Sequence, residues 1–153
     1  LKPGKLTTEE FEKMKKHTIY GRDAILAAEK RLGHNSFLRL ACEIAYFHHE
    51  KWDGSGYPEG FKGEEIPVSG RLMALVDVYD ALVSKRVYKP PYPHKKAVAI
   101  ITEGKGTYFD PDIVDAFLEL EERFRQIALE NVDYEEERKT LSEATEEPDD
   151  KKL

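Results

Sequence analysis

Apolar residues recur at spacings of three and four along most of the 153-residue chain, which is the period of an amphipathic α-helix. The sequence shows neither an internal repeat nor a convincing pair of strands. The pattern therefore predicts an all-α single domain built as a helical bundle. The helical segments are residues 7–17, a piece with Ile25, Leu26 and Ala28 that stops at Gly33, and residues 37–50, 69–86, 94–103 and 110–130.

Residue types at the ends of these segments indicate where the helices begin. Thr7 and Glu10 have the spacing of a capping box, in which each side chain binds the backbone N–H of the other residue. Ser36 is expected to cap the third segment, while Asp110 and Pro111 suit the N-cap and first turn of the last one. The buried stripe of this last helix is predicted to be Ile113, Phe117, Phe124 and Ile127.

The segment 37–50 is informative because two of its apolar rows end in histidine. These rows are Phe37, Ala41, Ile44 and His48, and then Leu38, Cys42, Ala45 and His49. The polar face is predicted to be Arg39, Glu43, Tyr46 and Glu50. His48 and His49 are therefore expected to point inward at slightly different angles, and buried imidazoles need partners.

Composition agrees with one folded domain followed by a polar tail. The apolar share of 40% is enough for a core. Residues 131–153 hold nine acidic and four basic residues, which is -5 of the net charge of -6 and leaves -1 for residues 1–130. We expect a domain at 1–130 and a linker or disordered tail at 131–153. No basic field marks a protein that binds duplex nucleic acid, although a local cluster of Lys and Arg could still bind a small anionic ligand.

The number of cysteines and the hydropathy of the chain indicate the kind of cellular environment in which the protein folds. Cys42 is the single cysteine, so no disulfide framework is predicted, which is compatible with a reducing cytoplasm. Neither an apolar run near 18 residues nor a basic and then apolar leader is found, so no membrane segment or signal peptide is expected. The chain begins without Met, and we expect it to be the middle of a longer protein.

Asp77 lies in the apolar segment LMALVDVYDAL, where an isolated carboxylate would be costly to bury. It needs a cation or hydrogen-bond donors, and Asp80, three residues later, adds a second negative charge that favours a nearby cation. Arg71 or Arg86 could instead satisfy Asp77 as an ordinary ion pair. The sequence leaves both interpretations open.

His17 continues the apolar stripe of Phe11 and Met14, which adds a third imidazole to His48 and His49. A lone histidine on an apolar row is usually a satisfied core residue. Several of them with a buried carboxylate suit first-row metals such as zinc, iron or manganese, and the lack of thiolates argues against a structural zinc site. Adjacent histidines whose side chains point in different directions suit a two-metal cluster, a kind of site that hydrolyses phosphoesters.

Two further segments flank this chemistry. Arg86 and Lys89 in KRVYK could grip phosphate, or they could simply complement the dipole at a helix C-terminus. GSGYP could be an ordinary turn, yet it directly follows the paired histidines and is expected beside whatever they bind. His34 and His94 lie in turn-like contexts and are predicted to be surface residues.

Taken together, HHEKWDGSGYPEGFKGEEIP and RLMALVDVYDALVSKRVYK resemble the HD-GYP subgroup of the HD metal-dependent phosphohydrolases. KPGKLTTEEFEKMKKHTIYG and GKGTYFDPDIVDAFL are similar to its flanking segments, so the resemblance covers residues 1–130. It implies an HD-domain-like helical bundle that holds two or three iron or manganese ions and hydrolyses cyclic di-GMP, a bacterial second messenger, to pGpG or GMP. It also implies signalling-protein partners and a receiver or sensor domain before Leu1, as in two-component systems, and it leaves a homodimer open.

The resemblance assigns roles by position. The metal ligands would be His17, His48, His49 and Asp77. Arg86 and Lys89 would contact substrate phosphate, and the loop beside the cluster would be shaped by Gly56, Tyr57 and Pro58.

The chain departs from the subgroup in two places. The His-Asp pair and the following Lys that the subgroup carries are expected just upstream of Leu1 and are not in this sequence, and RVY replaces the more usual RPY. The catalytic residues are therefore unassigned, and this chain alone is expected to hydrolyse poorly. An alternative is an inactive module that binds nucleotide or a partner protein through the GYP loop and the neighbourhood of Tyr46 and Trp52. A further alternative is an HD hydrolase that acts on another nucleotide.

Overall fold

The structure is a computed structural model that describes residues 6–33, 35–86, 90–132 and 134–142. These residues form helices joined by loops, with an isolated bridge between Lys105 and Phe109 and no β-strand within the described ranges. The all-α prediction is confirmed. The elements are α1 (Thr8–Lys15), α2 (His17–Leu32), α3 (Ser36–Phe47), the 3-10 turn η1 (Gly63–Glu65), α4 (Val68–Val83), α5 (His94–Glu103), α6 (Pro111–Glu130) and α7 (Glu135–Ser142).

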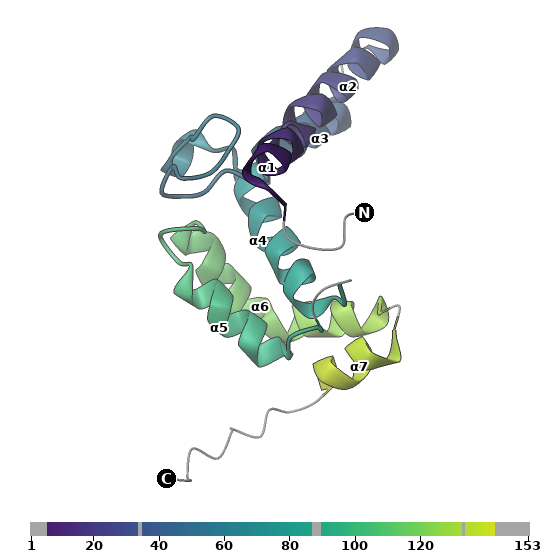
Figure 1. The fold of residues 1–153 in the computed structure, drawn as a ribbon, viewed down its shortest axis with the longest axis vertical. Coiled ribbons are helices and arrows are strands. Elements are labelled where there is room, and N and C mark those ends of the chain that lie inside the picture. Colours follow the sequence, from purple (N-terminus) through teal and green to yellow (C-terminus); the bar gives the residue numbers. More distant parts are fainter. Residues whose placement is uncertain (1–5, 34, 87–89, 133, 143–153) are drawn as a thin grey trace.

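Helix α4 joins the two parts of the molecule. Figure 1 shows α1, α2 and α3 gathered near its beginning, and α5, α6 and α7 along its other end. Contacts follow the same division, because α3 packs on α2 and α4, while α5 and α6 pack on α4 and on each other. The long loop between α3 and α4 connects the parts a second time. Trp52 and Asp53 donate backbone N–H groups to the carbonyl oxygens of Tyr108 and Thr107 at 3.1 and 2.9 Å.

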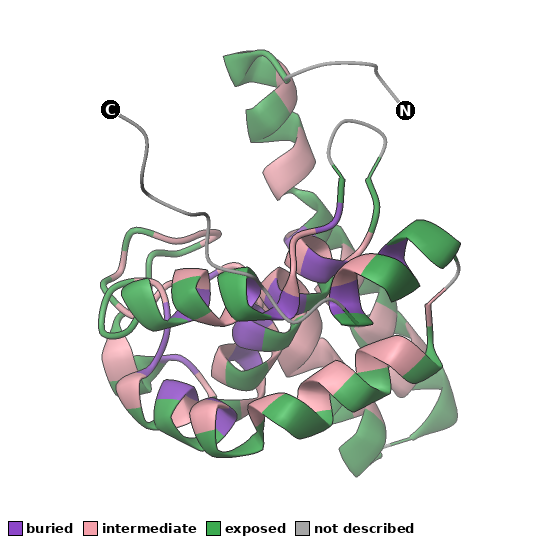
Figure 2. Cartoon of the chain, turned by 90° about the horizontal axis from the view of Figure 1, so that it is seen from below, coloured by how far each residue is buried: buried purple, intermediate pink, exposed green. Residues whose placement is uncertain are grey.

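The hydrophobic core lies among α4, α5, α6 and α7, and Figure 2 shows buried positions toward the middle of the molecule with exposed positions outside. Tyr79, Phe117 and Phe124 meet edge to face, with the two phenylalanine ring centroids 4.9 Å apart. Each such buried side chain contributes about 1.5–3 kcal/mol. The buried members of the cluster are Leu75, Tyr79, Val83, Ala97, Ile101, Phe109, Val114, Phe117 and Leu141.

The part formed by α1, α2 and α3 buries much less. Thr18 is the buried residue of α2, and neither α1 nor α3 contains one. Phe37 is 72% exposed and Leu40 48% exposed. The prediction that the row beginning at Phe37 faces a core is therefore wrong at its start. Amphipathic spacing shows which face of a helix is apolar, but it does not show whether a neighbouring element covers that face.

Several predicted helix ends are confirmed. Thr7 and Glu10 form the capping box, with N···O distances of 2.7 and 3.2 Å, and α2 ends before Gly33. Asp110 caps α6 by accepting the Asp112 N–H at 2.9 Å. The cap of α3 was predicted one residue late. Asn35, rather than Ser36, accepts the Phe37 N–H, at 2.8 Å.

Three predictions for the part of the chain after α4 need correction. Part of the expected tail forms α7, in which Leu141 is 1% exposed and joins the core, while residues 143–153 lie outside the described ranges. Ile127 is 46% exposed and does not belong to the buried stripe of α6. His94, expected at the surface, is buried and shares a 3.0 Å hydrogen bond with the Tyr79 hydroxyl, whereas His34 lies outside the described ranges.

Candidate metal centre

Three histidines from two places in the chain converge at one point. His17 is the first residue of α2, His48 is the C-cap of α3, and His49 follows it. One ring nitrogen of each lies within 4.8 Å of the others. The chain achieves this because α1 breaks immediately before His17 and α3 ends at Phe47, so all three imidazoles stand at helix ends, where the chain changes direction.

Hydrogen bonds to the backbone fix the tautomers of two of these rings. His17 Nδ1 lies 2.7 Å from the Met14 carbonyl oxygen, and His48 Nδ1 lies 2.9 Å from that of Ile44. A carbonyl oxygen only accepts, so each Nδ1 must carry the proton, and in the neutral ring Nε2 then presents a lone pair. This second hydrogen bond of the ring is the usual arrangement of histidines that bind metals.

The two Nε2 atoms of His17 and His48 lie 3.3 Å apart. Two lone pairs at that distance repel each other unless a proton or a metal ion lies between them. Two nitrogens that each bind one ion at about 2.0–2.1 Å, with a tetrahedral angle between them, are about 3.3 Å apart. The observed spacing therefore fits a shared cation.

The third imidazole is held in its neutral form. Burial, together with the nearby His48 and His17, lowers the pKa of His49 to about 4, while Asp77 acts in the opposite direction. At neutral pH this ring carries no proton on one nitrogen and can act as a ligand. The three rings together offer the nitrogen donors that first-row metals favour.

Asp77 lies on α4 with an intermediate exposure, and its charge acts on His49, Tyr57 and Tyr108. It is near the cluster, but its carboxylate is not one of the groups that meet within 4.8 Å. The expected alternative partner Arg71 is engaged elsewhere. It forms an ion pair with Asp110 at 2.5 Å and donates to the Ile66 carbonyl oxygen at 2.8 Å. The ion pair that we considered for Asp77 is thus not made by Arg71.

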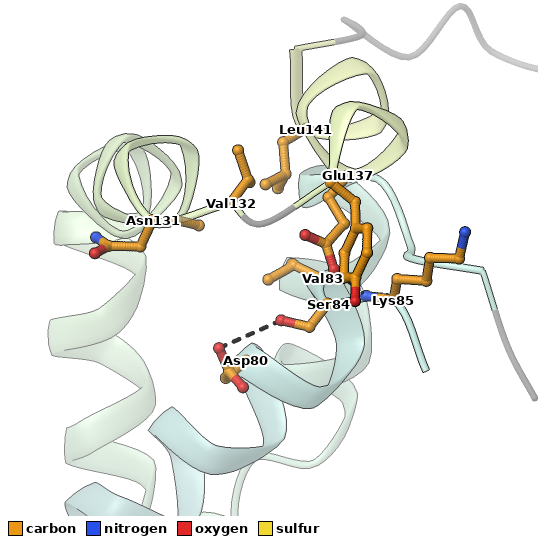
Figure 3. Close-up of a pocket in the computed structure, with 10 residues that line it drawn as sticks. Asp80, Val83, Ser84, Lys85, Asn131, Val132, Glu137 and Leu141 are labelled. Atoms are coloured by element: carbon orange, nitrogen blue, oxygen red, sulfur yellow. Dashed lines mark hydrogen bonds between the residues drawn. The ribbon is translucent and has the colours of Figure 1, made fainter. Parts of the chain in front are cut away.

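Asp80 does not add its charge to the histidine cluster, contrary to expectation. It lies near the C-terminal end of α4 and lines a separate pocket of about 260 Å³ that α6 and α7 complete. Figure 3 shows Asp80 beside Ser84, whose hydroxyl donates to it at 3.4 Å, with Glu137 and Lys85 farther along the same pocket. Asp80 is exposed, and none of His17, His48 and His49 lines this pocket.

Glu50 was predicted on the polar face of α3, and this prediction is wrong. The helix ends at Phe47, and the chain then turns so that Glu50 is only 1% exposed. Its carboxylate accepts the backbone N–H groups of Glu59 and Gly60, at 2.8 and 3.1 Å. A carboxylate directly before a glycine-rich loop is the signal that could have indicated this role, since such a loop offers free backbone donors.

The GYP loop packs directly on the second of the paired histidines. A Cβ on Gly56 would lie 2.4 Å from the backbone nitrogen of Lys51 and 2.5 Å from the Cα of Glu50, so only glycine fits there. Tyr57 follows, its ring centroid 4.8 Å from that of His49 with 34° between the planes. The loop thus lies beside His49, and the Tyr57–Pro58 bond is cis.

Cations near the cluster differ from those that the sequence indicated. Arg86 is exposed in the segment after α4, and Lys89 lies outside the described ranges. Lys15 was not predicted, yet its ammonium lies 5.1 Å from the centroid of the Phe11 ring and 5.7 Å from that of Tyr57, the ring that covers His49. Its position in the last turn of α1, two residues before His17, was the available signal.

The comparisons with known proteins agree with a metal site of this kind. A sequence profile described as HD domain matches residues 1–113. The chain belongs to the HD domain family. Members of this family depend on metals, and the matched residues include His17, His48, His49 and Asp77.

Relatives of the HD domain chain include two curated proteins of Vibrio cholerae serotype O1. A cyclic di-GMP phosphodiesterase is 62% identical over 84% of this chain and 26% of its own length. A 3'3'-cGAMP-specific phosphodiesterase 2 is 44% identical over 77% of this chain and 22% of its own length. The chain therefore spans about a quarter of each relative.

A solved structure shows the same fold. The crystal structure of a cyclic GMP-AMP specific phosphodiesterase of V. cholerae, V-cGAP3, superposes with a TM-score of 0.57 and 24% sequence identity, covering 80% of this chain and 27% of that chain. Within the described ranges, none of the helices is both long and apolar enough to cross a bilayer.

Proposed function

We propose that this chain is part of a metal-dependent phosphodiesterase that hydrolyses cyclic di-GMP to pGpG or GMP. The observation that carries the proposal is the convergence of His17, His48 and His49 with two Nε2 lone pairs 3.3 Å apart. The 62% identical relative, which is named a cyclic di-GMP phosphodiesterase, supports the choice of substrate.

In this proposal His17, His48 and His49 hold the metal, with Asp77 as a further ligand from α4. Iron or manganese, as two or three ions, is the expected occupant. A bound divalent cation supplies Lewis acidity for phosphate oxygens and lowers the pKa of water toward neutrality. Further metal ligands from the His-Asp pair, and the Lys near the substrate, are expected upstream of Leu1.

The residues of this chain also prepare the site for an anionic substrate. The Tyr57 ring packs on the His49 ring. Lys15 places its ammonium over the Tyr57 ring. Arg86 and Lys89, in the segment after α4, would contact substrate phosphate. Charged groups that already face the reacting phosphate stabilise developing charge without reorganisation.

The context of the enzyme belongs to the same proposal. It acts in the cytoplasm, in a bacterial signalling pathway, with a receiver or sensor domain before this chain and with signalling partners or a second copy. Size-exclusion chromatography with light scattering of the full-length protein tests the homodimer, and the residues encoded upstream of Leu1 test the preceding domain.

The test of activity uses the full-length protein, loaded separately with iron, manganese and zinc. It is incubated with cyclic di-GMP and with 3'3'-cGAMP, and the products are separated by chromatography. We expect pGpG from cyclic di-GMP with iron or manganese. Product from 3'3'-cGAMP alone would move the proposal to the substrate of the 44% identical relative. Tight binding of nucleotide without product from any metal-loaded form would support the inactive module instead.

A further inference from the structure

His49 differs from the other two histidines in how its ring is held. His17 and His48 each donate Nδ1–H to a carbonyl oxygen of the preceding helical turn. Among the described residues, no hydrogen bond holds a ring nitrogen of His49. Its orientation must therefore come from packing, and outside the cluster the aromatic ring that packs on it is that of Tyr57, with centroids 4.8 Å apart.

The backbone holds Tyr57 on His49. The Tyr57 N–H donates to the His49 carbonyl oxygen at 3.1 Å, which closes the loop on the residue that it covers. Gly56 makes this approach possible, because its Cα lies against the backbone of Glu50 and Lys51. The stack is thus a property of the closed loop and not of the Tyr57 side chain alone.

The Glu50 carboxylate binds backbone N–H groups on the far side of the loop. One carboxylate oxygen accepts the N–H of Glu59 at 2.8 Å, and both carboxylate oxygens accept the N–H of Gly60 at 3.1 Å. These donors follow Pro58 directly, so a single side chain ties the far end of the loop to its beginning. A carboxylate that is 1% exposed loses its hydration, and these hydrogen bonds replace it.

We propose that Glu50 is a positioning residue for His49: it closes the loop, the loop stacks Tyr57 on the imidazole, and the stack aims that imidazole at the point where His17 and His48 meet. The effect of Glu50 on metal binding in the enzyme rests on the proposed metal-dependent function. Its effect on the orientation of His49, through Tyr57, rests only on the contacts described above.

The experiment compares Glu50→Ala and Glu50→Gln with the control Glu64→Gln, which changes an exposed glutamate of the same loop. The full-length protein is labelled with 15N-histidine, and the imidazole signals and the Tyr57–His49 ring contact are followed by NMR without metal. We expect Glu50→Ala to move the His49 signals and abolish the contact. Glu50→Gln keeps the volume and one acceptor, so it restores them in part, and Glu64→Gln leaves them unchanged.

A second measurement titrates the same proteins with Co²⁺ and records its visible spectrum. Loss of a partner that orients a metal ligand costs roughly 10–100-fold in metal affinity, and we expect Glu50→Ala to fall in that range. Glu50→Gln should lie between Glu50→Ala and the wild type, and its spectrum should move in the same direction.

The outcomes separate this inference from the proposed function. If Glu50→Ala lowers only the melting temperature, with His49 signals and cobalt affinity unchanged, Glu50 is merely structural and the inference is overturned. If the wild type takes no cobalt but Glu50→Ala still displaces His49, the positioning role holds and the metal-dependent function fails. Should Glu50→Ala not fold, Glu50→Gln makes the same comparison.

Discussion

His17 and His48 are 31 positions apart in the sequence, yet their Nε2 atoms lie 3.3 Å apart, and the Nδ1 of each is bound to a carbonyl oxygen three or four residues earlier in the chain. This relationship predicts the effect of removing one ring. We expect His17→Ala to weaken binding of Mn²⁺ or Co²⁺ by more than the roughly 10–100-fold that loss of an outer partner costs. Calorimetry measures the affinity, and Lys16→Ala, an exposed neighbour, is the control. Equal affinities for both variants would refute a metal site that includes His17.

Replacement of Lys15 is predicted to weaken substrate binding and to leave metal binding unchanged. Its ammonium lies over the adjacent Phe11 and Tyr57 rings, and it pairs with Glu12 at 2.6 Å. A hydrogen bond from a charged group contributes about 1.5–3 kcal/mol, so Lys15→Met should raise KM for the cyclic dinucleotide about tenfold or more, with metal content unchanged.

The matched control for this prediction is Lys13→Met on the same helix. Lys13 has a side chain that is 71% exposed and pairs with Glu9, four residues earlier. Steady-state kinetics over a range of salt concentrations measures both variants. A rise in KM for Lys13→Met as large as that for Lys15→Met would indicate a general charge effect and contradict a specific contact between Lys15 and the substrate.

The ion pair between Arg71 and Asp110 predicts a large effect on stability. It joins the start of α4 to the N-cap of α6, and the two side chains are 15% and 3% exposed. Asp110→Asn retains the cap but leaves the guanidinium without its partner, and we expect a loss of about 3 kcal/mol, at the lower end for a broken buried pair. Urea unfolding measures the loss, with Asp112→Asn in the first turn of α6 as the control. A loss equal to that of the control would show that the pair contributes nothing.

His94 predicts a dependence of stability on pH. Burial lowers its pKa below the ordinary 6.5, and Arg125 acts in the same direction, while Glu121 and Glu122 oppose it. The unfolded chain therefore takes up a proton below about pH 6.5 that the folded chain refuses, so stability falls as pH decreases through that value.

His94→Gln keeps a hydrogen-bonding group opposite the Tyr79 hydroxyl and removes this titration. The measurement compares melting temperatures of the wild type and the variant from pH 7.5 to pH 5. The wild type should lose more stability than the variant over that range. Parallel curves for the two proteins would mean that His94 is not held neutral by the fold.

Leu141 tests whether α7 belongs to the domain. Its side chain is 1% exposed within the core cluster, so Leu141→Ala should cost about 2–5 kcal/mol. Thr140→Ala, on the same helix, should cost much less. Unfolding in urea measures both, and a negligible cost for Leu141→Ala would restore the expectation of a tail that starts at residue 131.

Local signals were enough to predict much of the fold. The capping box at Thr7 and Glu10, the stop at Gly33 and the cap at Asp110 each depend on a few neighbouring residues, and the structure contains all three. The exposure of Phe37 and the burial of Leu141 depend on which elements pack together, and periodicity does not contain that information. The prediction from periodicity therefore gave α3 too many buried residues and did not include α7.

The candidate site shows the same division. Paired histidines after an apolar helix predicted the cluster, because an imidazole on an apolar row needs a partner. Glu50 was placed on the polar face, since the prediction continued α3 beyond Phe47, where the structure ends it. The role of Glu50 depends on a loop that folds back across ten residues, and the spacing of polar residues along a helix does not report such a contact.

The Nδ1 anchors of His17 and His48 have a mechanical consequence. Each anchor is made to a carbonyl oxygen three or four residues earlier in the chain, to Met14 at the end of α1 and to Ile44 of α3. The distance between the two Nε2 atoms therefore depends on how α1 and α2 pack against α3 more than on rotation of the side chains. A cation bound to both nitrogens would link the junction of α1 and α2 to the C-terminal end of α3.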